Sequence, residues 1–200
     1  VTNGWNVIAV VSAMSKETNK LIDLAKQVGV ESLVDPEYDS LISTGEDVSS
    51  SLLAIALNSV GISSRSWRGW QLPLRTDSFH SNAKIEEIET KKILTNFKEG
   101  IKVAVVSGFQ GIEQSGRITT LGRGGSDTSA VAIAAAIDAE RCDIYTDVSG
   151  IYTTDPRIKK NASKLKKISF EEMLEMASLG ANVLQTLSLI HISEPTRPLY

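Results

Sequence analysis

The chain has 200 residues, of which 42% are hydrophobic and 22% charged, a composition typical of one globular domain with a sizeable core. A formal net charge of −3, without any dense basic run, argues against a nucleic-acid partner. The single cysteine excludes an internal disulfide, and no apolar stretch is long enough to cross a membrane. We therefore expect a cytoplasmic protein with neither a nucleic-acid nor a membrane partner.

The first quarter of the chain alternates between strand and helix patterns. Residues 6–11 (NVIAVV) form a continuous run rich in β-branched residues, which predicts a strand buried on both faces. Apolar residues at helical spacing predict a helix over 21–28, and residues 35–38 look like a linker. The polar segment 43–47 then opens a second helix. Its predicted inner face is made of Val48, Leu52, Ile55, Ala56 and Val60.

The middle of the chain is less regular. Residues 62–74 contain short strand-like pieces, in which two tryptophans are expected to pack over a sheet edge. Residues 75–84 read as an exposed loop, and His80 in this loop has no partner at metal or triad spacing. An amphipathic pattern with many charges then predicts a helix over 85–97.

Further strand patterns follow. Residues 102–106 (KVAVV) predict a second buried strand, and residues 115–121 predict a hairpin-like return. A short strand is expected at 143–145, beside Cys142, which we interpret as an inert buried thiol. Because strands alternate with helices, the sequence predicts an α/β fold with a mostly parallel sheet covered on both faces.

A glycine-rich turn and an apolar helix occupy residues 122–136 (GRGGSDTSAVAIAAA). Ser126, Asp127 and Thr128 are residue types that cap a helix start, and residues 129–139 are apolar nearly all round, as in a buried helix. The N-terminus of such a helix attracts anions, and Arg123 could hold a carboxylate or phosphate with two hydrogen bonds. A simple tight turn with a helix cap explains the same glycines equally well.

The polar loops that follow the strands are expected to gather at one edge of the sheet, where ligands bind in such folds. Two histidines and one cysteine leave no plausible Ser/His/Asp triad and no zinc cluster, and the GxxxxGK[ST] loop is absent. Acidic residues in a first helical turn also offset the helix dipole, which would account for Glu46 without a ligand. The candidate site residues are Ser12, Thr18, Glu46, Phe109, Arg123, Ser126, Asp127, Thr146, Asp147, Tyr152, Asp155 and Arg157.

Six segments of the chain, in the order in which they occur, resemble motifs of a known family. They are VVSAMSKETN, LISTGEDVSS, VVSGFQGI, ITTLGRGGSDTSAVAIA, DIYTDVSGIYTTDPR and FEEMLEMASLGANVL. Together they cover about residues 5–186, and the sequence resembles the aspartate kinases of the amino acid kinase family. The pairing of GRGGSD with TDVSGIYTTDPR is the most specific part of this resemblance.

The resemblance implies a three-layer α/β/α sandwich that transfers the γ-phosphate of ATP, with Mg²⁺, to the side-chain carboxylate of L-aspartate. The product would be 4-phospho-L-aspartate, on the route to lysine, threonine and methionine, and the full-length parent would be a homo-oligomer. By motif match, aspartate would contact Ser12, Thr18, Glu46, Phe109, Arg123 and Ser126. ATP would contact Thr146, Asp147, Tyr152, Asp155 and Arg157. Arg123 and Asp127 would be catalytic, with Asp127 at the phosphoryl-transfer centre, and no metal site would be formed by protein ligands.

The chemistry agrees with these roles. An aspartate side chain has a pKa of about 4, so the nucleophile is ionised at neutral pH without a general base. The difficulty is to bring two anions together, which requires positive charge and positioning. Arg123 suits the α-carboxylate of the substrate, Glu46 suits its α-ammonium group, and a helix N-terminus suits a phosphate.

The chain departs from the family pattern in several places. It begins after the KFGGTS-like strand and its lysine, Asn182 replaces a frequent lysine, and the C-terminal regulatory ACT domains are missing. Residues 1–186 are interpreted as a catalytic domain without its first strand, and residues 187–200 as an artefactual tail. We expect the chain alone to be impaired in turnover. Two alternatives stay open: a related kinase acting on glutamate, acetylglutamate or UMP, and a non-catalytic binding module.

Overall fold

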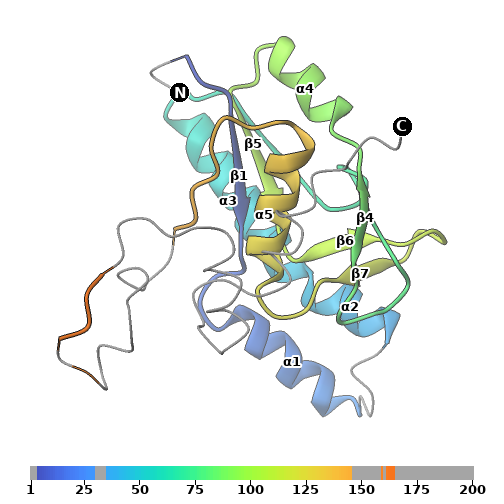
Figure 1. Cartoon of the computed structure of the whole chain (residues 1–200). Coiled ribbons are helices and arrows are strands. Elements are labelled where there is room, and N and C mark those ends of the chain that lie inside the picture. Colours follow the sequence, from blue (N-terminus) through green and yellow to red (C-terminus); the bar gives the residue numbers. More distant parts are fainter. Residues whose placement is uncertain (1–3, 30–34, 146–158, 160, 165–200) are drawn as a thin grey trace, which may run out of the picture.

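A three-stranded parallel sheet lies at the centre of the fold (Figure 1). The computed structural model describes residues 4–29, 35–145, 159 and 161–164. The sheet has the order β1 (Val7–Val11), β5 (Val103–Ser107), β2 (Ser64–Trp67). Val7 is in register with Val103 and Val11 with Ser107, so β1 and β5 end side by side. The two apolar runs predicted as strands, 6–11 and 102–106, are thereby confirmed within one residue at each end.

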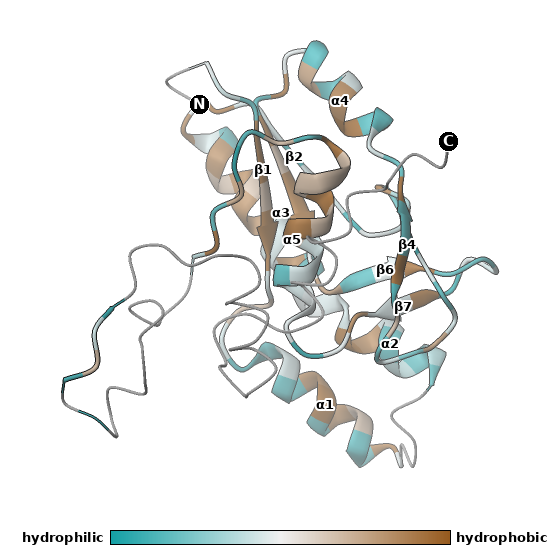
Figure 2. Ribbon diagram, viewed as in Figure 1, coloured by the Kyte–Doolittle hydropathy of each residue, from teal (hydrophilic) through white to brown (hydrophobic). Residues whose placement is uncertain are grey.

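Helices cover both faces of this sheet, because the side chains of its strands alternate between two apolar clusters. On one face Val103 and Val105 pack against α3 (Thr44–Ser59). On the other face Ala104 and Val106 belong to a cluster shared with α4 (Lys91–Lys98) and α5 (Gly125–Ala136). Figure 2 shows the apolar strands between these helices. The three-layer arrangement agrees with the predicted α/β class.

A second sheet, which the sequence did not predict, lies beside the first. Its order is β4 (Ile85–Ile88), β3 (Leu74–Thr76), β6 (Gln110–Ile112), β7 (Ile118–Thr120). β3 and β6 are parallel, whereas β3–β4 and β6–β7 are antiparallel, and the β6–β7 pair is the predicted hairpin. The expected loop over 75–84 and helix over 85–97 are therefore wrong in part. Strands of three or four residues are too short to show a clear alternation in sequence.

Two further helices pack together below the parallel sheet (Figure 1). Ala25 of α1 (Glu17–Gln27) and Tyr38 of α2 (Pro36–Ile42) share one apolar cluster. The predicted linker over 35–38 is in fact the start of α2. There the Asp35 carboxylate accepts a hydrogen bond from the Glu37 backbone N–H at 2.7 Å, and proline occupies the first helical position. This Asp–Pro pair is a helix-start signal that explains the difference.

The face of α3 that meets the sheet is opposite to the predicted one. Its buried residues include Glu46, Ser50 and Ala54. Val48 and Leu52 are each 49% exposed, and Ile55 and Val60, also placed on the inner face by the sequence, are exposed as well. The prediction assumed that the largest apolar side chains face inward, but small residues allow the helix to approach the sheet closely. The Ser64 hydroxyl, for example, donates to the Ala54 carbonyl at 2.8 Å.

A fully buried carboxylate joins α2 to the second sheet. Asp39 is 0% exposed and accepts hydrogen bonds from His80 Nδ1 at 2.9 Å, the Ser81 backbone N–H, and both the backbone N–H and the hydroxyl of Thr120. The prediction of a surface histidine without a partner is therefore wrong. Its partner is 41 residues away in sequence, at a spacing that no motif marks.

We expect Asp39→Ala to lower the free energy of unfolding by about 3 to 5 kcal/mol, because several buried donors lose their acceptor at once. Urea denaturation followed by circular dichroism measures this change. Glu37→Ala on the same helix is the matched control, since the Glu37–Arg117 ion pair is exposed, and it should leave the urea midpoint nearly unchanged. Similar midpoints for the two variants would contradict a stabilising role for Asp39.

The segment that follows α5 also differs from expectation. Residues 141–145 form no strand, and Cys142 is exposed rather than buried. α5 itself is buried on one side, through Val131 and Ile133 among others, while its last two residues are exposed. Among the described helices, none is long and apolar enough to cross a membrane.

Candidate active site

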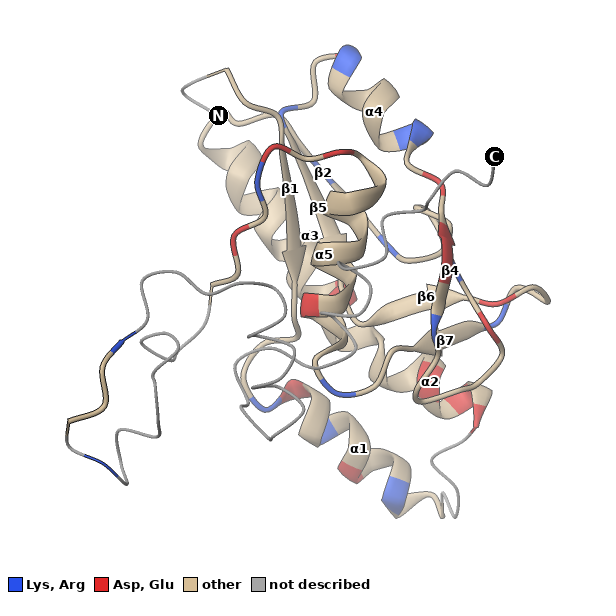
Figure 3. Cartoon of the chain, in the orientation of Figure 1, with Lys and Arg blue, Asp and Glu red and all other residues tan. Residues whose placement is uncertain are grey.

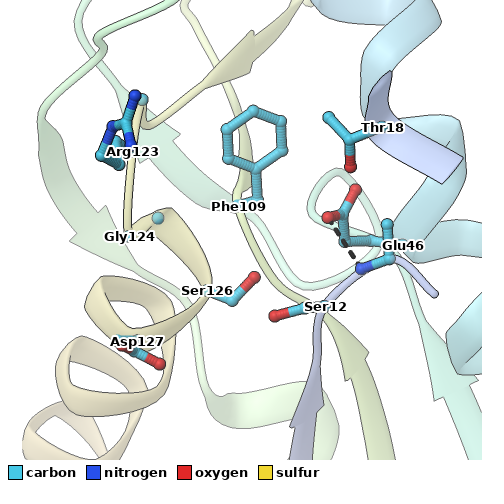
Figure 4. A pocket seen from close by; sticks show the side chains of 11 residues that line it. Ser12, Thr18, Glu46, Phe109, Arg123, Gly124, Ser126 and Asp127 are labelled. Atoms are coloured by element: carbon cyan, nitrogen blue, oxygen red, sulfur yellow. Dashed lines mark hydrogen bonds between the residues drawn. The ribbon is translucent and has the colours of Figure 1, made fainter. Parts of the chain in front are cut away.

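A pocket of about 260 Å³ lies beyond the C-terminal ends of β1 and β5, where α3 and α5 begin (Figure 4). All the predicted aspartate-site residues, and Asp127, are brought together there. Its lining consists of Ser12, Ala13, Thr18, Glu46, Phe109, Gly122, Arg123, Gly124, Gly125, Ser126 and Asp127. The predicted ATP residues Thr146, Asp147, Tyr152, Asp155 and Arg157 lie outside the described residues.

The glycine turn delivers the start of α5 to this pocket. Gly124 is the N-cap residue with a φ of 74°, a left-handed conformation that favours glycine, and no side chain caps the helix. Ser126, Asp127 and Thr128 were expected to cap the helix but lie within its first turn instead. The backbone at the helix start therefore faces the pocket without a side-chain cap, which is the arrangement that attracts anions.

The turn packs tightly against the loop that follows β5. A Cβ atom on Gly108 would lie 2.9 Å from the Ser126 Cα, and one on Gly125 would lie 2.8 Å from Cδ2 of Phe109. Phe109 has a φ of 67°, which is unusual for an aromatic residue. Its backbone is held there by hydrogen bonds from its N–H to Ser129 Oγ and to its carbonyl from the Leu121 N–H. Its ring forms one wall of the pocket.

Glu46 supplies a buried carboxylate to the pocket. It is 4% exposed, and its Oε1 accepts a hydrogen bond from the Ala13 backbone N–H at 3.0 Å. Its Oε2 has no hydrogen-bond partner among the described residues. Burial raises the pKa of Glu46 to about 7, the Ala13 N–H opposes this shift, and the charge of Asp47 adds to it. A buried carboxylate oxygen without a partner is costly, so a cationic ligand group would be stabilising here.

The positive charge of Arg123 lies across the pocket from the carboxylate of Glu46. Figure 4 shows Arg123 on the far side of the Phe109 ring from Glu46, and the Ser12 and Ser126 side chains pointing toward each other below it. Arg123 is exposed on the turn, whereas Asp127 is half-buried, and burial raises the pKa of its carboxyl group. A pocket with separated positive and negative groups suits a small zwitterion that carries both charges.

The charges of the two helices that begin at the pocket are confined to their first turns (Figure 3). They are Glu46 and Asp47 in α3 and Asp127 in α5. Within the described residues, these three carboxylates included, no group of three or more His, Cys, Asp or Glu side chains is placed to hold a metal ion. Sequence reasoning predicted the glycine turn but missed the Ala13 backbone donor, because a backbone N–H group leaves no residue-type signal.

The fold and the pocket together define an α/β protein that binds a small charged molecule at the C-terminal ends of its parallel strands. The chain belongs to the amino acid kinase family, whose sequence profile matches residues 1–194. It is 57% identical over 182 residues to an aspartokinase of Bacillus sp. (strain MGA3), an alignment that covers 91% of this chain and 44% of that relative. The chain thus spans less than half the length of the curated relative.

The solved structures that are similar to the described fold include two aspartate kinases. One is the aspartate kinase from Synechocystis, with a TM-score of 0.78 and 44% identity over 95% of this chain and 31% of that chain. The other is E. coli aspartokinase III in complex with aspartate and ADP, with a TM-score of 0.74 and 35% identity over 86% of this chain and 39% of that chain. The predicted amino acid kinase fold is therefore confirmed.

Proposed function

We propose that the full-length protein containing this chain transfers the γ-phosphate of ATP to the side-chain carboxylate of L-aspartate, giving 4-phospho-L-aspartate. The observation that carries the proposal is the pocket itself, in which a buried carboxylate oxygen, without a partner in the described part of the chain, faces an arginine across an aromatic wall. The similarity to proteins named aspartokinase, one of them solved with aspartate and ADP, supports the choice of substrate.

Each pocket residue has a distinct proposed role. Glu46 binds the α-ammonium group through Oε2, the oxygen without a partner among the described residues. Arg123 binds the α-carboxylate with a charge-assisted pair of hydrogen bonds. The Phe109 ring separates these two charges and gives the substrate its orientation. The remaining substrate contacts come from the hydroxyl groups of Ser12, Thr18 and Ser126, which line the same pocket.

The reaction needs positive charge and alignment rather than a base. The substrate carboxylate is already ionised at neutral pH, so the site must hold two anions close together in line. The uncapped start of α5 contributes positive potential at this point. Asp127 follows Ser126 in the first turn of α5, and its carboxylate is proposed to orient the groups between which the phosphoryl group is transferred. Thr146, Asp147, Tyr152, Asp155 and Arg157 are proposed to bind ATP, and Mg²⁺ bound with the nucleotide would neutralise charge on its phosphates.

We expect the full-length protein to form an acyl phosphate when given L-aspartate and MgATP. Hydroxylamine converts acyl phosphates into hydroxamates, which form coloured complexes with ferric iron, so the assay reports the bond formed. Glutamate and acetylglutamate in the same assay, and UMP in an assay of ADP release, distinguish the other kinases of the family. Folded protein that gives no aspartate-dependent hydroxamate would disprove the proposed reaction, and binding of aspartate without product would favour a non-catalytic module.

A further inference from the structure

Asp47 follows Glu46 in the first turn of α3 but does not line the pocket. Its Oδ1 accepts hydrogen bonds from Ser107 Oγ at 2.9 Å and from Gln110 Nε2 at 3.1 Å. Its Oδ2 lies 3.4 Å from Arg68 Nε. The carboxylate therefore connects the start of α3 to the end of β5 and the start of β6.

The groups that hold Asp47 are themselves fixed. Ser107 and Gln110 are each 1% exposed. Ser50 Oγ donates to the Asp47 carbonyl and lies 2.9 Å from Ser107 Oγ. Gln110 Nε2 also donates to the Ser43 carbonyl, just before α3 begins. Such a buried, mutually bonded network allows little movement between the elements that it joins.

This network lies directly behind two walls of the pocket. Glu46 is the neighbour of Asp47 in sequence, and Phe109 lies between Ser107 and Gln110, the two residues that Asp47 binds. We propose that Asp47 is a positioning residue of the substrate pocket, which holds Glu46 at a fixed distance from Phe109 through Ser107 and Gln110. The inference rests on the proposed function, in which Glu46 binds the α-ammonium group of aspartate.

The charge of Asp47 has a second effect, on the ionisation of Glu46. Burial is the main reason that the pKa of Glu46 rises, and Asp47 raises it further. Among the described residues, the other charged side chains that line the pocket are Arg123 and Asp127 at the start of α5. Lys16 and Glu17 lie where α1 begins, and Arg68 lies against Asp47. Removal of the Asp47 charge should shift the ionisation of Glu46 to lower pH, an effect separate from the geometric one.

Two substitutions separate the geometric effect from the charge effect. Asp47→Asn keeps an oxygen acceptor but removes the charge, whereas Ser107→Ala removes one hydrogen bond and leaves the charge. The matched control is Asp23→Asn, which removes a charge from a side chain that is 67% exposed on α1. In the full-length protein, KM for aspartate and for ATP is measured at pH 8, and kcat/KM for aspartate is measured between pH 5 and 9.

We expect Asp47→Asn and Ser107→Ala to raise KM for aspartate roughly tenfold while KM for ATP stays unchanged. The acid limb of kcat/KM should move to lower pH in Asp47→Asn alone. Asp23→Asn should match the unmodified protein in every measurement. Thermal melting of each variant identifies loss of fold, and if Asp47→Asn does not fold, the KM values of Ser107→Ala decide the geometric role.

Failure of this inference can be told apart from failure of the proposed function. An unmodified protein without aspartate-dependent product overturns both. If that protein is active and Asp47→Asn behaves like Asp23→Asn, only the positioning role is overturned. A lower melting temperature with unchanged KM, or an equal rise in both KM values, would likewise show that Asp47 serves the fold and not the pocket.

Discussion

Glu46→Gln should weaken aspartate binding by about a hundredfold or more, because the ammonium group would lose its charged partner and meet an amide N–H group instead. Gln keeps an oxygen that can accept the Ala13 N–H, so the local backbone should be preserved. Calorimetric titration with L-aspartate measures the loss of affinity. ATP affinity should stay within twofold, and an equal loss for both ligands would contradict the role of Glu46.

The same carboxylate predicts a pH dependence. Because the pKa of Glu46 is raised to about 7 in the ligand-free protein, the ionised form that binds an ammonium group is progressively lost below pH 7. Aspartate affinity should therefore fall by roughly tenfold per pH unit well below that pKa. Glu46→Gln should show no such dependence between pH 5 and 7. A flat profile in the unmodified protein would contradict an ionised Glu46 as the ligand group.

Glu46→Gln should weaken aspartate binding but raise the free energy of unfolding at neutral and alkaline pH. A carboxyl group whose pKa is higher in the folded state than in the unfolded state loses its stabilising effect as the pH rises through the folded value. Above pH 7 the folded protein bears the full cost of an ionised, buried Glu46, and Glu46→Gln should then be more stable by about 1 to 2 kcal/mol. The gain should shrink at pH 5, where Glu46 is protonated. Urea denaturation at pH 5 and pH 8 measures both values.

Arg123→Ala should raise KM for aspartate between about tenfold and a hundredfold, since a charge-assisted bidentate contact is worth roughly 1.5 to 3 kcal/mol. Arg123 is exposed on the turn, so its removal should leave the melting temperature nearly unchanged. Steady-state kinetics of the full-length protein with aspartate and ATP varied in turn provides the measurement.

Arg123→Lys is the matched control for this prediction, because it keeps the charge but loses the planar pair of donors. Its KM for aspartate should lie between those of the unmodified protein and Arg123→Ala. If KM for ATP rises as much as KM for aspartate in either variant, Arg123 does not act as the aspartate clamp.

The sequence predicted residues that line the pocket but not the buried face of α3, and the difference has a physical reason. The pocket residues were found because they lie in motifs of fixed spacing, and the parallel strands because β-branched runs have few other structures open to them. The predicted inner face of α3 was wrong because Glu46 and Ser50, which hydropathy places outward, are buried, and small residues let the helix approach the sheet. The prediction that His80 lies on the surface without a partner was wrong because tertiary packing alone brings Asp39 next to it.

The contact between Gly108 and Ser126 limits how the pocket can respond to a ligand. With 2.9 Å between a hypothetical Gly108 Cβ and the Ser126 Cα, the two backbones already touch at the base of the pocket. α5 therefore cannot slide toward the end of β5 when a small molecule enters. The spacing between the start of α5 and the end of β5 is therefore fixed before a ligand binds, so this side of the pocket needs no ordering when it is filled.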